Sequence, residues 1–137
     1  MRILVDTNVF LDYFLKRDEG DAELFFHNCY TLSNSIYVTS MSLRDIEYSL
    51  HRMLHNQELS KKYQRATYSI CDKVIGISAD AAIESLYSET KDYEDSLQIE
   101  AAKEAMLDCI VTSDKKDYKN CGIPIFTPKE INKYLKK

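Results

Sequence analysis

A carboxylate that directly follows a short apolar run is the feature that most restricts how this chain can fold. The run at residues 3–5 stops at Asp6, and Thr7 and Asn8 then open a second segment with the apolar spacing of a helix. Open α/β sheets bind ligands at the carboxyl ends of their strands, where such a strand-to-helix turn lies. Asp6 is therefore expected either to cap the helix, as Thr7 and Asn8 also could, or to belong to a site at the sheet edge.

Short apolar runs alternate with helical patterns along the whole chain. Strands are predicted at residues 2–5, 36–39, 74–77, 109–112 and 125–126. Helices are predicted at residues 8–16, 21–30 and 58–71, from a capping box at Ser42 and Asp45 to about residue 55, from a cap at Ser78 or Asp80 to residue 86, at about 94–107, and from Pro128 onwards. Nearly continuous apolar strands between helices predict a parallel sheet of four to five strands with helices on both faces, an α/β fold.

The chain is expected to form a single domain over residues 1–137, because it has only three glycines and two prolines and contains no linker. No apolar run approaches the roughly 18 residues of a membrane span, and the first residues lack the apolar core of a signal peptide. We therefore expect a cytoplasmic protein without a membrane partner. The formal net charge of −4 argues against a general nucleic-acid binder, which needs a wide basic surface.

One glutamate lies on a helix face that is otherwise apolar. Glu47 comes four residues after Leu43 and three before Leu50, so the three side chains share one face. An ionised carboxylate that faces a core costs several kcal/mol unless a cation or hydrogen-bond donors meet it. Glu47 is therefore a candidate metal ligand; the alternative is a carboxylate at the edge of this face, paired with Arg44 or Arg52.

Three aspartates later in the chain present the same choice. Asp95 shares a helix face with Ile99 and Met106, although an acid in the first turn also complements the helix dipole. Asp114 and Asp117 follow the fourth predicted strand, at the same sheet edge as Asp6. Each could instead cap a helix or pair with a neighbouring lysine, so none of them indicates a site by itself.

Taken together, these carboxylates predict a divalent-metal site. Several acids at one sheet edge would repel one another and raise one another's pKa values unless a cation neutralised them. Mg²⁺ and Mn²⁺ prefer oxygen ligands. Such an ion lowers the pKa of a bound water and polarises a phosphoryl oxygen, and a second ion about 4 Å away could hold the leaving oxygen. The chemistry expected is hydrolysis of a phosphodiester without a nucleophilic side chain.

Four sequence motifs, in this order and spacing, resemble those of the PIN-domain ribonucleases, a family that includes the VapC-type toxins of bacterial toxin–antitoxin pairs. They are Asp6–Asp12 (DTNVFLD), Ser42–Glu47 (SLRDIE), Asp92–Gln98 (DYEDSLQ) and Val111–Tyr118 (VTSDKKDY). The resemblance covers essentially the whole chain. It implies a single PIN-like, Rossmann-like domain that cleaves RNA with Mg²⁺ or Mn²⁺.

The resemblance also implies a role for individual residues. Asp6 is the first catalytic and metal-binding acid, Glu47 the second, Asp95 the third and Asp114 the fourth, with Asp117 as the substitute for Asp114. Two further residues would support them: Asn8 would orient the metal ligands, and Thr112 would hold an acid or a water. The family has a basic residue where this chain has Ser113, so an RNA contact there is in doubt.

RNA, an antitoxin and a second copy of the chain are the partners that the resemblance implies. One stretch is basic enough to contact an RNA backbone, and its residues are Arg52, Lys61, Lys62 and Arg65; a solvated helix face is the alternative. Two other functions stay open. The chain could be a catalytically silent PIN-like module that binds RNA or protein. It could also be a phosphatase with Asp6 as nucleophile, although such enzymes need an aspartate where Asn8 stands.

Overall fold

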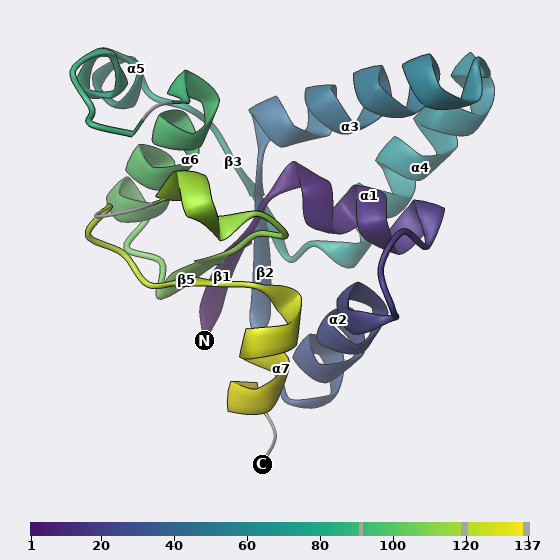
Figure 1. The fold of residues 1–137 in the computed structure, drawn as a ribbon. Helices are drawn as coiled ribbons and strands as arrows, with labels where there is room; N and C mark the ends of the chain where they lie inside the picture. The colour runs from purple at the N-terminus through teal and green to yellow at the C-terminus, as the bar shows by residue number, and fades with distance from the viewer. Residues whose placement is uncertain (91, 119–120, 136–137) are drawn as a thin grey trace.

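Five parallel strands form one sheet in the order β3-β2-β1-β4-β5 within the part of the chain that the computed structural model describes, residues 1–90, 92–118 and 121–135 (Figure 1). The side chain of Asp117 lies outside this description as well. The strands are β1 (Arg2–Val5), β2 (Ser35–Thr39), β3 (Lys73–Ile75), β4 (Cys109–Val111) and β5 (Ile125–Phe126). The predicted α/β fold with a parallel sheet is confirmed.

Helices cover both faces of the sheet (Figure 1). They are α1 (Thr7–Leu15), α2 (Asp21–Thr31), α3 (Ser40–Leu54), α4 (Gln57–Ile70), α5 (Ala79–Leu86), α6 (Tyr93–Glu104) and α7 (Pro128–Leu135), with a 3-10 turn, η1 (Lys115–Tyr118), after β4. Each predicted helix is present among the described residues, and its ends differ by a few positions from the prediction. None of these helices combines the length and apolar character that a membrane crossing needs.

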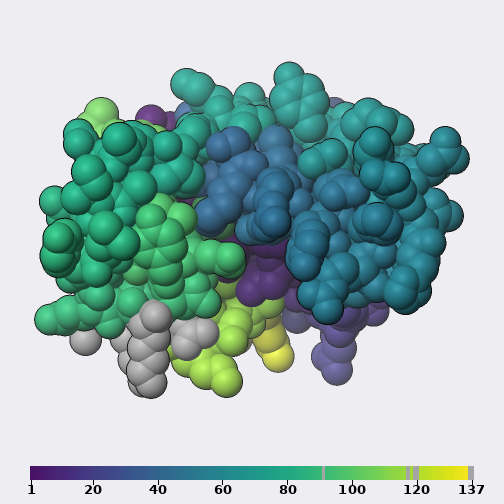
Figure 2. All heavy atoms as spheres, turned by 90° about the horizontal axis from the view of Figure 1, so that it is seen from above, coloured from purple at the N-terminus to yellow at the C-terminus, as the bar shows by residue number. Residues whose placement is uncertain are grey.

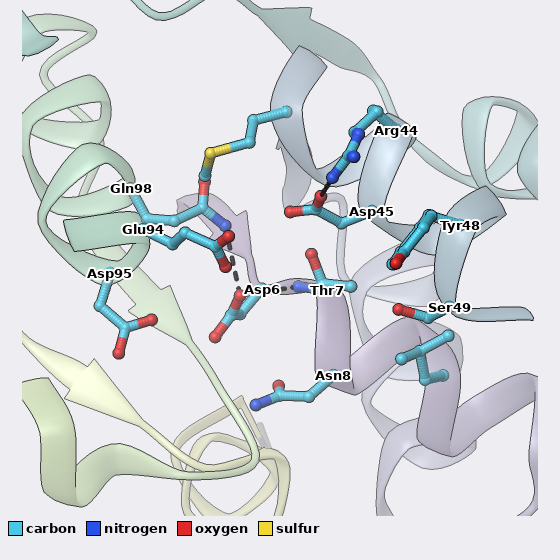
Figure 3. Close-up of a pocket in the computed structure, with 12 residues that line it drawn as sticks. Asp6, Thr7, Asn8, Arg44, Asp45, Tyr48, Ser49, Glu94, Asp95 and Gln98 are labelled. Carbon is cyan, nitrogen blue, oxygen red and sulfur yellow. Dashed lines mark hydrogen bonds and ion pairs between the residues drawn. The ribbon is translucent and has the colours of Figure 1, made fainter. Parts of the chain in front are cut away.

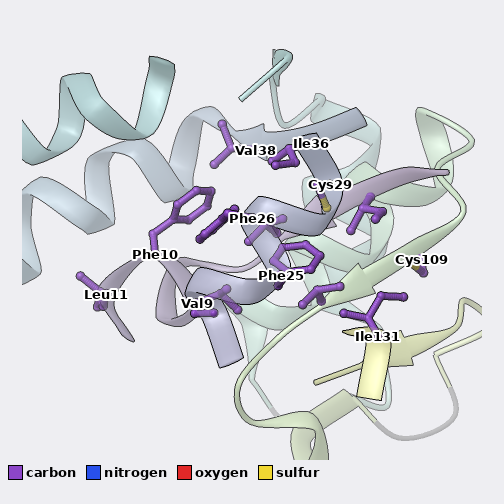
Figure 4. Packing of buried hydrophobic residues seen from close by; sticks show 14 of the residues in the cluster. Val9, Phe10, Leu11, Phe25, Phe26, Cys29, Ile36, Val38, Cys109 and Ile131 are labelled. Atoms are coloured by element: carbon purple, nitrogen blue, oxygen red, sulfur yellow. The ribbon is translucent and has the colours of Figure 1, made fainter. Parts of the chain in front are cut away.

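The core divides into two clusters because neighbouring residues of a strand point to opposite faces. Ile3 and Val5 of β1 contact the larger cluster, which α1, α2, α3 and α7 cover (Figure 4). Leu4, between them, contacts the smaller cluster beneath α6. Every one of these three side chains is fully buried. The central strand is therefore held from both sides, and the residue that follows it has a fixed position.

Two helix caps border the sheet edge, and one of them differs from the prediction. Asp6 caps α1 by accepting a hydrogen bond from the backbone N–H of Thr7. Thr39 caps α3 by accepting from the N–H of Ser42, so the predicted capping box at Ser42 is wrong. Asp45 therefore does not take part in capping α3.

Replacing Phe25 with alanine is expected to lower the free energy of unfolding by about 3–5 kcal/mol. The Phe25 ring is fully buried in the larger cluster and lies 5.2 Å from the ring of Phe26, centroid to centroid. Its neighbour Leu24 is 42% exposed, so Leu24→Ala is the matched control and should cost little. Urea denaturation followed by circular dichroism measures both. Equal losses in the two variants would contradict this packing.

Candidate functional site

A cavity of about 350 Å³ opens at the carboxyl edge of the sheet, between α1, α3 and α6. Seen from above, the start of α1 lies at its floor, with α3 on one side and α6 on the other (Figure 2). The chain places β2 and β3 on one side of β1 and β4 and β5 on the other, so the strand order changes direction at β1, and the cavity lies at the end of this strand. Ligands of open α/β sheets bind at such a point. Its lining residues are Asp6, Thr7, Asn8, Leu11, Met41, Arg44, Asp45, Tyr48, Ser49, Glu94, Asp95 and Gln98.

The Asp6 carboxylate at the floor of this cavity is held by four hydrogen-bond donors. Its Oδ1 accepts from the backbone N–H of Thr7 (2.8 Å) and from Nε2 of Gln98 (3.3 Å). Its Oδ2 accepts from the hydroxyls of Thr112 (2.9 Å) and Tyr118 (3.0 Å). Asp6 is 9% exposed. The two interpretations of Asp6 are thus compatible, because the same side chain caps α1 and faces the cavity (Figure 3).

Gln98 connects three segments around this carboxylate, and the sequence analysis gave it no role. Its Nε2 donates to Ser42 Oγ (2.9 Å) as well as to Asp6, and its Oε1 accepts from Thr39 Oγ1 (2.8 Å). The side chain is 2% exposed. The sequence did contain one sign of this role: Gln98 is a polar amide that lies among the apolar residues of α6, three positions after Asp95.

Tyr118 is the second residue that the sequence analysis missed. It is 3% exposed and belongs to the smaller core cluster, with its hydroxyl directed at Asp6. Burial raises the pKa of this phenol far above its ordinary value, and the carboxylates of Asp6 and Asp95 raise it further. The Tyr118 hydroxyl is therefore protonated at neutral pH and donates its hydrogen bond to Asp6.

Asp95 lies on α6, half-buried, and lines the cavity together with Asp6 (Figure 3). Asn8 also lines the cavity, and it contacts the fully buried Thr112. The Nδ2 group of Asn8 donates to Thr112 Oγ1 (3.3 Å), and its Oδ1 accepts from the N–H of Ser113 (3.0 Å). Asn8 thereby ties the loop after β4 to the start of α1, and this loop carries the threonine that holds Asp6.

Glu47 does not lie in the cavity, contrary to the prediction. It is half-buried, and its Oε1 lies 3.4 Å from Oγ of Ser60 on α4. Asp45 lines the cavity instead, paired with Arg44 at 3.0 Å (Figure 3). Two positions along a helix are roughly 200° apart, so Asp45 and Glu47 cannot share a face. The leucines beside Glu47 belong to the larger core cluster. Glu47 itself is partly exposed and accepts a hydrogen bond from Ser60, so its carboxylate does not need a cation.

Asp114 and the four predicted basic residues do not line the cavity. Asp114 is exposed, and its backbone N–H donates to Thr112 Oγ1 (3.3 Å). The Asp117 carboxylate is outside the described residues. Lys61, Lys62 and Arg65 line a separate hollow on α4 of about 560 Å³. The fourth, Arg52, lies in the last turn of α3.

One further acid, Glu94, lines the cavity from the first turn of α6. Burial raises its pKa, and the nearby carboxylates of Asp45 and Asp92 raise it further. The cavity thus gathers the carboxylates of Asp6, Asp45, Glu94 and Asp95 on three elements. Their oxygen atoms are the ligand type that Mg²⁺ and Mn²⁺ prefer.

The oxygen ligands of these acids suit Mg²⁺ or Mn²⁺, but the carboxylates are not arranged around one common point. Within residues 1–90, 92–118 and 121–135, no three acidic, histidine or cysteine side chains are close enough together to hold a metal ion as they lie. Both oxygens of Asp6 already accept two hydrogen bonds each. Mg²⁺ usually keeps several of its waters and binds through one or two carboxylates, so an ion in the cavity would contact some of these acids through water.

Comparison with known proteins gives one family match and several similar structures. Residues 2–116 match a sequence model described as a PIN domain. A comparison with characterised protein sequences gives no match.

The similar structures share the fold at low sequence identity. One is VapBC2 from Rickettsia felis, bound to a DNA fragment of its promoter (TM-score 0.68, 19% identity, covering 92% of this chain and 97% of that one). Another is a toxin–antitoxin complex from Klebsiella pneumoniae (TM-score 0.61, 24% identity, covering 92% of this chain and 97% of that one). A third is FitAcB from Neisseria gonorrhoeae (0.64, 14%, 93% and 98%).

Replacing Gln98 with leucine is expected to lower the free energy of unfolding by about 1–3 kcal/mol, because buried polar partners lose their hydrogen bonds. The partners are the hydroxyls of Thr39 and Ser42 and the carboxylate of Asp6. Gln57→Leu, at an exposed position of α4, is the control. Chemical denaturation of both variants tests this, and a Gln98→Leu protein as stable as the control would refute the network.

Proposed function

This chain belongs to the PIN-domain family, and from that premise we propose that it is a divalent-metal-dependent endoribonuclease and the toxin of a toxin–antitoxin pair. One observation carries the proposal. A buried carboxylate, Asp6, is held by four donors at the floor of a cavity whose walls bring further acids. A group held this firmly is suited to position a reacting centre, because catalysis depends on preorganised geometry.

The residues of the cavity divide the work between position and charge. Gln98, Thr112 and Tyr118 fix both oxygens of Asp6 from α6, the end of β4 and η1. Asp45 and Asp95 face it from opposite walls. Mg²⁺ or Mn²⁺ bound by these three acids would supply a water of lowered pKa and would polarise the phosphoryl oxygen.

The toxin assignment is supported by the resemblance to VapC-type toxins and by one of the similar structures, which is a toxin–antitoxin complex. An antitoxin is therefore the proposed protein partner, and RNA the proposed substrate. A homodimer stays a prediction of the sequence resemblance, and a cytoplasmic location stays a prediction of the hydropathy of the sequence.

A second candidate function is a silent PIN module that binds RNA or protein without cleaving it. The observation in its favour is that, among the described residues, the carboxylates do not form a metal site as they lie. The phosphatase alternative has no such support. Asn8 stands where a second aspartate is needed, and its amide is engaged with Thr112 and Ser113.

The Asp45→Asn variant is expected to lose at least about 100-fold in RNA cleavage rate, since even a residue that only orients a metal ligand costs roughly 10- to 100-fold. Asp6→Asn and Asp95→Asn should lose as much. Glu47→Gln is the matched control and should keep wild-type activity, because Glu47 faces α4. Initial rates on a labelled RNA with Mn²⁺ measure this. If Glu47→Gln loses activity and Asp45→Asn keeps it, the assignment of Asp45 as the second acid is wrong. If cleavage survives both Asp6→Asn and Asp95→Asn, the metal-dependent mechanism is wrong.

Adding Mn²⁺ to the wild-type protein is expected to raise its melting temperature. Binding to the folded state alone stabilises it by about 2.7 kcal/mol at a free metal concentration 100 times the Kd. Asp6→Asn should abolish the shift, whereas Asp80→Asn, at an exposed position of α5, should preserve it. Differential scanning fluorimetry with increasing Mn²⁺ and an EDTA reversal measures the effect. A wild-type protein that does not respond would favour the silent module.

A further inference from the structure

A stripe of two arginines and one tyrosine borders the cavity on α3; we call Arg44, Tyr48 and Arg52 the α3 stripe. Their spacing of four residues places them on one face of the helix. The guanidinium carbon of Arg44 lies 4.9 Å from the centroid of the Tyr48 ring, and that of Arg52 lies 5.7 Å from it. Arg52 also donates a hydrogen bond to the Tyr48 hydroxyl (3.3 Å). Both guanidinium groups thus lie close to the Tyr48 ring.

The α3 stripe leads from the cavity to the surface. Arg44 and Tyr48 line the cavity (Figure 3), whereas Arg52 does not. At 1.5 Å of rise per residue, Arg44 and Arg52 are about 12 Å apart along the helix axis. Tyr48 is 47% exposed, so part of its ring is open to a ligand.

The opposite wall of the cavity is acidic, whereas the α3 wall carries Arg44 as well as Asp45, with which it is paired. Glu94 and Asp95 line it from α6, and carboxylates repel the phosphates of a nucleic acid. The formal net charge of −4 adds to this repulsion over the whole molecule. An RNA backbone that reaches the floor of the cavity is therefore attracted to the α3 wall, where guanidinium groups can bind phosphates.

We propose that the α3 stripe binds the RNA substrate as a single strand, with an unpaired base stacked on Tyr48 and the flanking phosphates on Arg44 and Arg52. This inference rests on the proposed function and adds the substrate class and the path of the strand. An aromatic ring exposed between cations is the usual platform for single strands. Stacking needs a base that is free of its partner, so a fully paired duplex is a poor ligand for the stripe.

The basic residues of α4, which the sequence analysis named with Arg52 as candidate RNA contacts beside the alternative of a solvated helix face, offer a weaker platform. Lys61, Lys62 and Arg65 line their hollow together with Glu58 and without an aromatic side chain. That hollow is separate from the cavity that holds Asp6. A strand bound there would have phosphate contacts but no stacked base and no direct continuation to the acids.

The test measures binding of a fluorescent single-stranded RNA of mixed sequence by anisotropy, in EDTA and at low salt, so that no hydrolysis occurs. Tyr48→Leu is expected to weaken binding by about 5- to 150-fold, the usual effect of losing one stacked base. Tyr48→Phe keeps the ring and should bind close to the wild type. Tyr68→Leu, on α4 and 63% exposed, is the control and should not change the affinity.

The salt dependence of the same binding locates the phosphates. Arg52→Gln should reduce the slope of log Kd against log salt by about 0.7, the value for one phosphate contact on a single strand. Lys61→Gln should leave the slope unchanged. A duplex of the same sequence should bind more weakly than the single strand. The inference is overturned if Tyr48→Leu binds like the wild type, if Lys61→Gln and not Arg52→Gln changes the slope, or if the duplex binds as tightly.

The assay also separates this inference from the proposed function. Binding in EDTA does not depend on metal or on cleavage, so a protein that binds through the stripe but never cleaves RNA with Mn²⁺ leaves the inference standing and removes the enzyme. Conversely, if Tyr48→Leu and Arg52→Gln change neither the Kd for RNA nor the rate of cleavage, the RNA site on the α3 stripe is refuted and the proposed ribonuclease activity stands.

Discussion

The arrangement of the whole site depends on the four hydrogen bonds that hold the Asp6 carboxylate. An ionised carboxylate with so little exposure would cost several kcal/mol without such partners, and the donors offset that cost. Three of them come from residues 92, 106 and 112 positions away along the chain. Asp6 is thus correctly held only when β1, β4, α6 and η1 have all assembled, and the geometry of the site is a property of the finished fold.

The order of the strands explains why this carboxylate lies in an open cavity. From β1 the chain continues to β2 and β3 on one side and then crosses to β4 and β5 on the other. The helix that follows β2 and the helix that precedes β4 therefore stand on opposite sides of the end of β1. They form walls of unlike chemistry, with Arg44 and Tyr48 on α3 and with Glu94 and Asp95 on α6.

Sequence patterns predicted the elements and the sheet edge well, because these follow from local periodicity and from the rule for parallel strands. They gave the wrong acid on α3, because this helix packs against the rest of the protein with two different faces. The apolar spacing around Glu47 correctly indicated a packed face, but that face meets α4, whereas Asp45 meets the cavity. Periodicity does not tell which partner a face meets. Gln98 and Tyr118 were missed because their partner, Asp6, is remote in sequence and a single chain gives no sign of such a pairing.

Arg44 connects the two proposals, for the metal and for the RNA. It forms an ion pair with Asp45 at 3.0 Å and also lies over the ring of Tyr48. A cation bound to Asp45 competes with Arg44 for the same carboxylate, and a phosphate on the α3 stripe competes with Asp45 for the same guanidinium. Each ligand thus weakens the ion pair that opposes the other. Under the two proposals, metal and RNA therefore bind with positive coupling, and by linkage each raises the affinity for the other by the same factor.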